Sequence, residues 1–316
     1  MQVAVLVLPQ VMDSSLSITL DVISAANQLA GYQGRAAPFS VVTAGLGRRV
    51  QAGSGLHIGG LTPLRALGVP ALVVVPGARL ALPAQLDAWL ASPPLRRAIG
   101  WLRQQAEQGA AVAASCAGTF VLAEAGLLQG RTATTTWWLA PHFRQRYPGV
   151  ELDMQQMVVG DAQVRCGGAA FSQADLMLEL VASHAGPALA QDCARYLMLD
   201  RRSSQMRYAI PGHLARQHPV IGEAERWIRQ RLHQPIHIGE LAAALHLTPR
   251  TLARRFDSSL GMSPLRFVQR LRVEQARHLI DTARLPLQTV AERVGYADAA
   301  TLRRLLLRES GSARRP

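Results

Sequence analysis

Hydrophobic positions in the first two hundred residues follow two alternating patterns. Short, continuous apolar runs predict strands at Val3–Leu8, Phe39–Thr43, Ala71–Val75 and Ala110–Ala114. Apolar residues spaced three and four apart predict helices at Ser15–Leu29, Ala84–Leu90, Leu95–Gln108 and Phe120–Leu128. Strands that are apolar throughout and alternate with helices are typical of a mostly parallel sheet covered on both faces.

The same alternation continues to about residue 199. Helices are predicted at Thr136–Tyr147, Phe171–Ser183 and Pro187–Leu199, and short strands near Val150–Leu152, Met157–Val159 and Gln163–Cys166. Residues 1–199 are therefore expected to form one α/β domain with a flavodoxin-like, mostly parallel sheet and helices on both faces. The following segment, DRRSSQMRYAIPG, is polar, rich in arginine and ends in Pro-Gly, which indicates an interdomain linker at 200–216.

The remaining residues, 217–316, are helical in pattern and repeat one plan twice. Helices are predicted at Ile221–Leu232, Ile238–Leu247, Pro249–Ser258, Pro264–Thr282, Leu287–Val294 and Asp298–Arg308. Thr248 and Pro249 suit the start of the third helix, and Gly295 suits the turn before the last one. A compact helix, a tight turn and a second helix with exposed arginines form a helix-turn-helix unit. We therefore expect an all-α domain with two such units.

A continuous helix is predicted between the two helix-turn-helix units. Its length of about 19 residues, at 1.5 Å per residue, corresponds to roughly 28 Å. One turn of B-DNA is about 34 Å long. The second helices of the two units can therefore enter successive major-groove segments on one face of a duplex.

The charge distribution favours a polyanionic partner for the second domain. The chain has 34 basic residues, all of them arginine, against 21 acidic ones. Residues 1–209 hold 16 arginines and 12 acidic residues, a net charge of +4, whereas residues 210–316 hold 18 and 9, a net charge of +9. Nucleic acid is the commonest partner of such a segment. Binding of RNA or of another protein is an alternative that explains the charge but not the paired motifs.

Cysteine content and hydropathy narrow the class of protein further. Cys116, Cys166 and Cys193 are too few and too scattered for a disulfide framework or a zinc site, so no metal and no cofactor is expected. The N-terminal sequence has no positively charged leader, and no apolar run approaches the roughly 20 residues of a membrane span. A cytoplasmic protein without a membrane partner is expected.

The most suggestive chemistry lies where the strand Ala110–Ala114 meets the next helix. The connecting residues Ser-Cys-Ala-Gly-Thr place Cys116 at a small-residue turn, which is the arrangement of a nucleophile elbow. A helix N-terminus next to this cysteine predicts a lowered thiol pKa. The alternative is that Cys116 is a small apolar residue that fills a tight turn. Trp137 and Trp138 either line a pocket beside the elbow or belong to the core.

The run ASCAGTFVLAEAGLLQGRTATTTW resembles the elbow region of the PfpI-type, class I glutamine amidotransferase-like domain. It is still more similar to the GlxA subgroup of AraC-type regulators, in which that domain is fused to a DNA-binding domain. Further matching stretches are VLVLPQ, LDVISAAN, VVVPG and CGGAAFSQADLMLELV. The resemblance covers essentially the whole chain and implies a sensor or dimerisation domain followed by a DNA-binding domain.

The chain departs from this pattern at the positions that catalysis needs. Enzymes of the PfpI type have a histidine where this chain has Ala117, and the regulators usually have one where it has Thr136. Ser15 stands about where an acidic residue supports the cysteine, although Asp13 and Asp21 are close in sequence. A cysteine without a positioned base is a poor nucleophile. We therefore expect a catalytically degenerate domain rather than an enzyme.

A vestigial elbow can still bind a small molecule. The expected ligand-binding residues are Cys116, Ala117, Thr136 and Trp137, at the carboxyl ends of the strands. The alternative function is a cysteine-dependent amidase or hydrolase that acts through Cys116.

The stretches LTPRTLARRFDSSLGMSPLRFVQRLRVEQARHLI and LPLQTVAERVGYADAATLRRLL resemble the AraC/XylS DNA-binding domain. By position, the resemblance implies DNA contacts from Arg250, Thr251, Arg254, Arg255, Asp298, Thr301, Arg303 and Arg304. An alternative for some of these arginines is solvation or pairing with Asp257 or Glu309. Leu252, Phe256 and Leu302 are expected to be buried. The ending GSARRP lacks the usual Gly-x-Ser-Pro and final helix, and leucines occupy 305–307 where an aromatic residue is common, which predicts weaker packing of the second unit.

Taken together, the sequence predicts a sequence-specific, DNA-binding transcription regulator controlled by a small molecule or by dimerisation. Its expected partners are double-stranded DNA, a small-molecule effector and a second copy of the chain. The AraC resemblance adds RNA polymerase, the contact that an activator makes. The small-molecule effector is expected to shift the dimer between existing arrangements of its DNA-binding domains.

Overall fold

A computed structural model describes residues 1–200, 202, 204, 205, 208, 219–260, 262–283 and 285–310, with 308–310 described by their backbone alone. The chain divides into two compact units, Met1–Met206 and Arg207–Pro316. Most of the predicted linker at 200–216 lies outside the described residues, as does the altered ending at 311–316. Within the described ranges, no helix combines the length and apolar character that a membrane span requires.

The first unit is built on a seven-stranded sheet with the strand order β10-β11-β7-β6-β1-β2-β5. Its strands are β1 Gln2–Leu6, β2 Ser40–Gly45, β5 Thr62–Pro63, β6 Leu72–Val75, β7 Ala111–Ser115, β10 Val158–Gly160 and β11 Val164–Gly167. Every neighbouring pair is parallel except β10 with β11. The predicted mostly parallel sheet is confirmed, and β7 lies inside it between β6 and β11.

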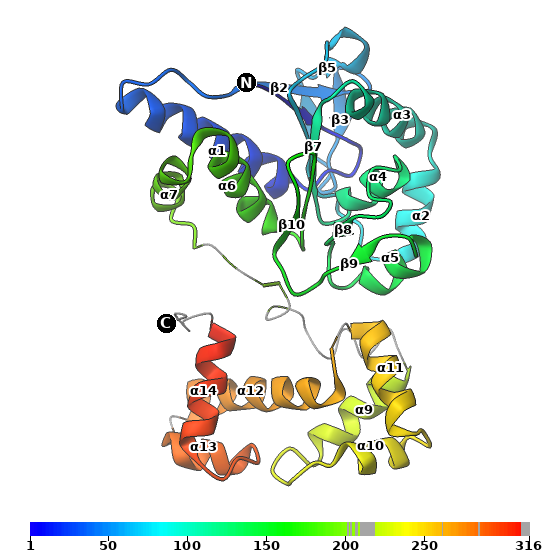
Figure 1. The fold of residues 1–316 in the computed structure, drawn as a ribbon, viewed down its shortest axis with the longest axis vertical. Coiled ribbons are helices and arrows are strands. Elements are labelled where there is room, and N and C mark those ends of the chain that lie inside the picture. The colour runs from blue at the N-terminus through cyan, green and yellow to red at the C-terminus, as the bar shows by residue number, and fades with distance from the viewer. Residues whose placement is uncertain are drawn as a thin grey trace. The chain divides into compact units, whose positions relative to one another are not determined.

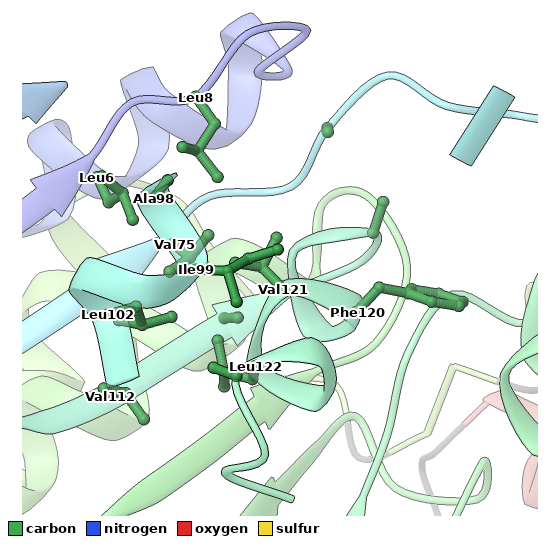
Figure 2. Packing of buried hydrophobic residues seen from close by; sticks show 14 of the residues in the cluster. Leu6, Leu8, Val75, Ala98, Ile99, Leu102, Val112, Phe120, Val121 and Leu122 are labelled. Carbon is green, nitrogen blue, oxygen red and sulfur yellow. The ribbon is translucent and has the colours of Figure 1, made fainter. Parts of the chain in front are cut away.

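Helices cover both faces of this sheet (Figure 1). One face carries α1 Asp13–Tyr32, α6 Ser172–Ala185 and α7 Pro187–Tyr196. The other carries α2 Pro83–Ala91, α3 Pro93–Glu107, α4 Gly118–Glu124 and α5 Ala140–Arg146. Figure 2 shows the core on this second face, where residues of α3 and α4 such as Leu102 and Val121 pack against Leu6, Val75 and Val112 of the strands.

Small elements surround the main sheet. The strands β3 Arg49–Gln51 and β4 His57–Gly59 form an antiparallel pair, and β8 Thr132–Ala133 pairs in parallel with β9 Glu151–Leu152. A short 3-10 helix, η1, covers Leu64–Ala66. None of β3, β4, β5 and β8 was predicted. They are two or three residues long and mostly exposed or half-buried, so they lack the apolar run that marks a buried strand.

The predicted helix at Thr136–Tyr147 is wrong at its start, because α5 begins only at Ala140. Residues 134–139 are irregular, and the Thr135 hydroxyl donates a hydrogen bond to the Cys116 carbonyl at 2.8 Å. This side chain therefore ties the segment to the elbow rather than to a helix. The helix predicted at Phe120–Leu128 likewise begins at Gly118 and ends at Glu124.

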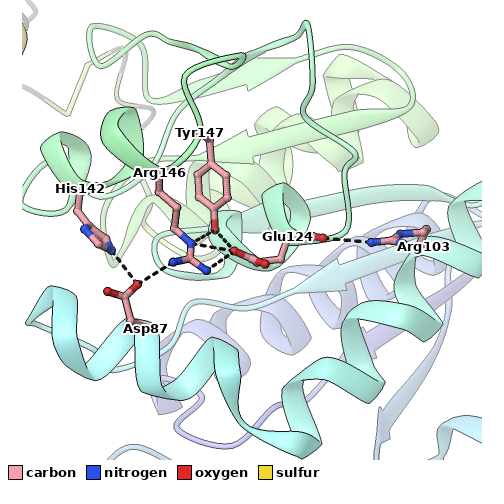
Figure 3. Close-up of polar contacts among 6 residues, drawn as sticks. All are labelled: Asp87, Arg103, Glu124, His142, Arg146 and Tyr147. Atoms are coloured by element: carbon pink, nitrogen blue, oxygen red, sulfur yellow. Dashed lines mark hydrogen bonds and ion pairs between the residues drawn. The ribbon is translucent and has the colours of Figure 1, made fainter.

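A network of charged side chains fixes α5 against α2 and α4 (Figure 3). His142 Nε2 lies 2.9 Å from Asp87 Oδ1, and Arg146 Nη2 lies 2.7 Å from Glu124 Oε1. The Tyr147 hydroxyl donates to the same Glu124 oxygen at 2.6 Å. The network holds α5 in place, and with it the irregular segment 134–139 that runs over the elbow.

The regular secondary structure in the described residues of the second unit is entirely helical. Its helices are α9 Pro219–Arg229, α10 Ile238–Ala244, α11 Pro249–Leu260, α12 Pro264–Ala283, α13 Leu287–Arg293 and α14 Ala299–Ser310. The long helix α12 contacts α11 on one side and both α13 and α14 on the other (Figure 1). The predicted all-α region, with a long helix between two groups of shorter ones, is confirmed.

Candidate nucleic-acid interface and elbow site

The two helix pairs of the second unit share one turn geometry. His246 follows α10 with φ 54°, and Gly295 follows α13 with φ 81°. Each left-handed residue is followed by an amide that bonds back to a buried alanine, Leu247 N to Ala242 O and Tyr296 N to Ala291 O, both at 2.9 Å. The turn predicted at Gly295 is confirmed. The repetition shows that both pairs are helix-turn-helix units.

Glycine is needed at 295 for a second reason besides its positive φ. A Cβ at this position would lie 2.3 Å from the carbonyl oxygen of Leu232, which lies between α9 and α10. The segment before the first helix-turn-helix unit therefore meets the turn of the second one at this point, and no other side chain fits there.

The second helix of each unit begins with the same kind of cap. In the first helix-turn-helix unit, Thr248 Oγ1 accepts a hydrogen bond from Thr251 N at 3.2 Å and donates one to Thr251 Oγ1 at 2.9 Å. In the second, Asp298 Oδ1 accepts from Thr301 N at 2.7 Å, and Thr301 Oγ1 donates to Asp298 Oδ2 at 3.0 Å. The predicted cap at Thr248 is confirmed. These helix caps engage polar atoms of Thr251, Asp298 and Thr301. Contact of these three residues with DNA stays a prediction.

Five arginines of the two second helices face solvent. Leu252, Phe256 and Leu302 are fully buried, as predicted, and they orient α11 and α14. The exposed faces of these helices then carry Arg250, Arg254, Arg255, Arg303 and Arg304. Arg250, Thr251 and Arg254 also line a shallow hollow together with Asp257. The arrangement presents positive charge on an exposed face of each of these two helices.

The cap at Asp298 makes the stability of the second helix-turn-helix unit dependent on pH. The Thr301 amide, and then its hydroxyl, hold the pKa of the Asp298 carboxyl below its usual range. A depressed folded-state pKa adds stability above the unfolded-state value, and this stability is lost as the pH falls through the folded value. Asp298→Ala is therefore expected to lower the Tm at pH 7, and the difference from the natural chain should shrink in acid. Circular dichroism melts across pH measure it.

Asp298→Asn is the matched variant for this test. It keeps an oxygen for the Thr301 amide but does not titrate, so it should destabilise less than alanine at pH 7. Equal Tm values for the alanine variant and the natural chain at pH 7 would show that the cap contributes nothing.

In the α/β unit, Met1–Met206, Cys116 occupies a strained turn between β7 and α4. Its φ is 55°, a left-handed conformation that is uncommon outside glycine and typical of a nucleophile elbow. Its amide donates to Gly168 O at 2.8 Å, and Thr136, whose Oγ1 is buried without a hydrogen-bond partner among the described residues, lies near its thiol. A Cβ placed on Gly77 would lie 3.0 Å from Cys116 Cβ and 3.3 Å from Ser15 Oγ, so Ser15 lies beside the elbow.

The predicted ligand-binding residues lie close to one another in the chain's fold but are covered. Cys116, Ala117 and Thr136 are buried, and Trp137 is 9% exposed. The rings of Trp137 and Trp138 are nearly perpendicular, with centroids 5.1 Å apart. Ser15 Oγ is buried without a hydrogen-bond partner among the described residues. The elbow is therefore a closely packed site in which some buried hydroxyl groups lack a hydrogen-bond partner among the described residues. Its role in ligand binding stays a prediction.

The lowered pKa predicted for Cys116 is wrong, because burial raises the pKa of its thiol. The backbone at Ala170 and Ala117 and the Thr136 side chain lower this pKa, but their effect is weaker than that of desolvation. Within the described part of the chain, these hydrogen-bonding groups around the thiol are backbone amides and a hydroxyl, none of which accepts a proton at neutral pH. The described residues contain no cluster of three or more potential metal-binding side chains.

The thiol of Cys116 is accordingly expected to be inert. Iodoacetamide labelling at pH 8 should be at least about tenfold slower in the folded chain than in denaturant, because the reactive thiolate is disfavoured by burial. Burial also raises the pKa of Cys166 to about 12 and that of Cys193 to about 11. Labelling should accelerate only at more alkaline pH. Peptide mass spectrometry identifies each site, and rapid labelling of Cys116 at pH 7 would contradict the assignment.

Two glutamines near the elbow were missed by the sequence analysis. Gln173 is fully buried, accepts a hydrogen bond from Ser115 Oγ at 2.5 Å and donates one to Thr19 Oγ1 at 2.8 Å. It thus joins β7, α6 and α1 beneath the turn. Gln205 had been placed in the linker, yet its side chain is buried against residues 134–135 and 168–169. Gln173 lies within the matching stretch CGGAAFSQADLMLELV, but the stretch does not show that its side chain reaches β7 and α1. Gln205 lies in none of the matching stretches, so no local pattern signals its role.

The first unit thus has a strained cysteine elbow inside a parallel sheet, and the second has two helix-turn-helix units. A model of the DJ-1/PfpI family matches residues 1–183, and a model of a helix-turn-helix domain matches residues 241–313. The chain belongs to the DJ-1/PfpI family. The resemblance inferred from its sequence motifs is confirmed.

Similar proteins are named as HTH-type transcriptional regulators. The HTH-type transcriptional regulator CdhR of Pseudomonas aeruginosa is 31% identical over 207 residues, which are 63% of this chain and 60% of that protein. The HTH-type transcriptional regulator GlxA of Rhizobium meliloti is 24% identical over 221 residues, 68% of each. The chain therefore spans about 60% of the length of the first of these relatives.

A solved structure agrees with the fold of the first unit. The crystal structure of an AraC family transcriptional regulator from Pseudomonas putida has a TM-score of 0.52 and 25% sequence identity. The match covers 62% of this chain and 98% of that one.

Proposed function

We propose that this protein is a sequence-specific, DNA-binding transcription regulator. The observation that carries the proposal is the repeated helix-turn-helix geometry, with matching turns at His246 and Gly295. In each unit, the second helix presents exposed arginines on the side away from its buried leucine. Arginine pairs with guanine edges in the major groove and with phosphates beside it. The names of CdhR and GlxA support the same function.

The length of α12 supports binding by both units to one face of DNA. Its 20 residues correspond to about 30 Å at 1.5 Å per residue. One turn of B-DNA is about 34 Å. In the proposal, α11 and α14 therefore enter adjacent major-groove segments. The DNA-contacting residues remain those inferred from the motifs, with the five exposed arginines contributing most.

In the same proposal, the first unit senses a small molecule or pairs two chains and does not catalyse a reaction. The raised thiol pKa of Cys116, and the amides and hydroxyl around it, disfavour the alternative cysteine-dependent hydrolase. Cys116, Ala117, Thr136 and Trp137 are the proposed ligand contacts. The proposed organisation is a sensor domain at 1–199, a linker at 200–216 and a DNA-binding domain at 217–316, acting as a cytoplasmic homodimer that contacts RNA polymerase.

The test is DNA binding by the purified full-length chain against genomic fragments that flank its own gene, over a salt series. Selective binding to one fragment, with a steep fall of affinity as salt rises, is the expected result. Weak binding that is equal for all fragments would overturn the proposal. Cys116→Ser is the matched control, because it should leave this binding unchanged if the elbow has no catalytic part in it.

A further inference from the structure

The side chain of Gln205 is held by a complete set of hydrogen bonds. Its Nε2 donates to Thr134 Oγ1 and to the Thr135 carbonyl, both at 2.9 Å. Its Oε1 accepts from the Ala169 amide at 3.0 Å. The residue is only 2% exposed, although it belongs to the segment that follows the last helix of the first unit. A buried amide with this many partners is bound specifically, because each unmet bond would cost free energy.

The pocket around Gln205 is shaped closely to a carboxamide. A Cβ on Gly168 would lie 2.6 to 2.7 Å from the carbon, nitrogen and oxygen of the Gln205 amide group. The plane of the amide thus rests directly on the backbone at 168. Thr134 and Thr135 are fully buried on the donor side. The site supplies one hydrogen-bond donor and two acceptors, which is the pattern that a primary amide complements.

A second contact fastens the same segment. The guanidinium of Arg202 lies on Asp175, with Nη2 at 2.5 Å and Nε at 3.0 Å from Asp175 Oδ2. The Arg202 amide donates to the other oxygen, Oδ1, at 2.9 Å. The Asp175 side chain is 7% exposed and belongs to the first turn of α6. Residues 202 and 205 are therefore attached to the first unit at two points, immediately before the second unit begins at Arg207.

The loops that hold Gln205 are also the loops that hold the elbow. Thr135 donates through its hydroxyl to Cys116 O at 2.8 Å and accepts through its carbonyl from Gln205. Gly168 accepts from the Cys116 amide at 2.8 Å and packs on the Gln205 side chain. One residue on each side thus contacts both groups. A change in either loop must affect both the elbow turn and the glutamine.

We propose that Gln205 is a releasable latch that occupies a carboxamide-binding pocket beside the elbow and fastens the segment leading to the second unit. A small molecule with a primary amide competes for this pocket, displaces Gln205 and frees that segment. The proposal rests on the proposed function only in giving the freed segment a DNA-binding unit to reposition. The released and latched forms are two states whose populations the ligand shifts by its differential affinity.

The latch is tested by tryptic cleavage after Arg202 in the full-length chain. Trypsin must bind the Arg202 side chain in its own specificity pocket, so cleavage requires the ion pair between Arg202 and Asp175 to break. Gln205→Ala and Gln205→Glu should raise the rate by about tenfold or more, because proteolysis follows the population of the open form. Glutamate keeps the shape but lacks the two N–H donors. Cleavage at the rate of the natural chain in both variants would overturn the proposal.

Two controls separate release of the latch from general unfolding. Gln191→Ala removes an exposed glutamine side chain on α7 and should leave the rate unchanged. Cleavage after Arg35, in an exposed loop of the same unit, provides an internal reference in every digest. Faster cleavage at both Arg35 and Arg202 in the Gln205 variants would mean that the unit unfolds, and this would overturn the latch.

The carboxamide pocket is tested with acetamide as the probe. Acetamide should accelerate cleavage after Arg202 in the natural chain, and it should raise the Tm of Gln205→Ala, whose pocket is vacated. Acetate, which has no N–H donors, should do neither. Absence of both acetamide effects would overturn the pocket. These readouts contain no DNA, so a protein that fails to bind an operator overturns the proposed function and leaves this test standing.

Discussion

Alanine at both Arg254 and Arg255 is expected to weaken binding to the selected operator by roughly a hundredfold or more, since each base or phosphate contact contributes about 1–3 kcal/mol. Both side chains lie on the exposed face of α11, one turn or more from its capped start. Their loss leaves the buried residues of that helix, Leu252 and Phe256, untouched. The fold should therefore persist while the interface loses two cations.

The salt series distinguishes what these two arginines do. Each phosphate contact that is lost lowers the slope of log K against log salt by about 0.9. Two phosphate clamps would thus reduce the slope by roughly 2, whereas base contacts would relax the sequence preference and leave the slope nearly unchanged. Affinity equal to that of the natural chain at every salt concentration would sink the assignment.

A double variant elsewhere controls for net charge. Arg96 and Arg97 are adjacent and exposed on α3 of the first unit, and their replacement by alanine removes the same two charges. This variant should bind the operator almost as the natural chain does. An equal loss in both double variants would show that overall charge, rather than the face of α11, sets the affinity.

The sequence predicted the architecture well wherever burial produces a clear pattern of apolar residues along the chain. The central strands β1, β6 and β7 are apolar except at Gln2 and Ser115, because helices cover them on both faces, and the helices of the second unit bury regular stripes. The edge elements β3 and β4 carry no such signal, since most of their side chains face solvent. Their existence depends on pairing across a turn, which a run of residue types does not encode.

The elbow site was predicted by position but not by chemistry. The small residues around Cys116 predict its turn, because only small side chains fit between β7 and α4. Its pKa depends instead on how completely the loops at 134–136 and 167–170 cover it, and these loops are distant in sequence. Gln205 shows the same limit. Its binding partners lie 36 to 71 positions away, so the residue reads locally as part of a polar linker.

Replacing Arg272 by alanine is expected to lower the free energy of unfolding of the second unit by about 2–4 kcal/mol, as for other buried, hydrogen-bonded polar groups. The residue lies in the middle of α12 and is 9% exposed. Its Nη2 donates to Gln234 O at 2.6 Å in the loop before α10, and its guanidinium stacks 5.1 Å from the centre of the Tyr296 ring. One side chain therefore joins the loop between α9 and α10 to the turn of the second helix-turn-helix unit.

This position makes Arg272 a spacer as well as a stabilising residue. The guanidinium lies close to the backbone at Gly295, where the Leu232 carbonyl also approaches, so the loop that leads into the first helix-turn-helix unit packs on the turn of the second. Arg272→Met fills much of the same volume without the hydrogen bond and should lose less stability than alanine. Arg277→Ala, on the exposed side of the same helix, should be nearly neutral. Urea unfolding of the full chain measures all three.

The consequence for DNA is a loss of coupling rather than a loss of contacts, because Arg272 is buried and away from the exposed arginines. The natural chain should bind an operator with both half-sites far more tightly than either half-site alone, since α11 and α14 are held at a fixed spacing. In Arg272→Met this ratio should fall, while affinity for a single half-site stays close to the natural value. A ratio that survives both substitutions would show that α12 alone sets the spacing, and that the guanidinium contributes stability only.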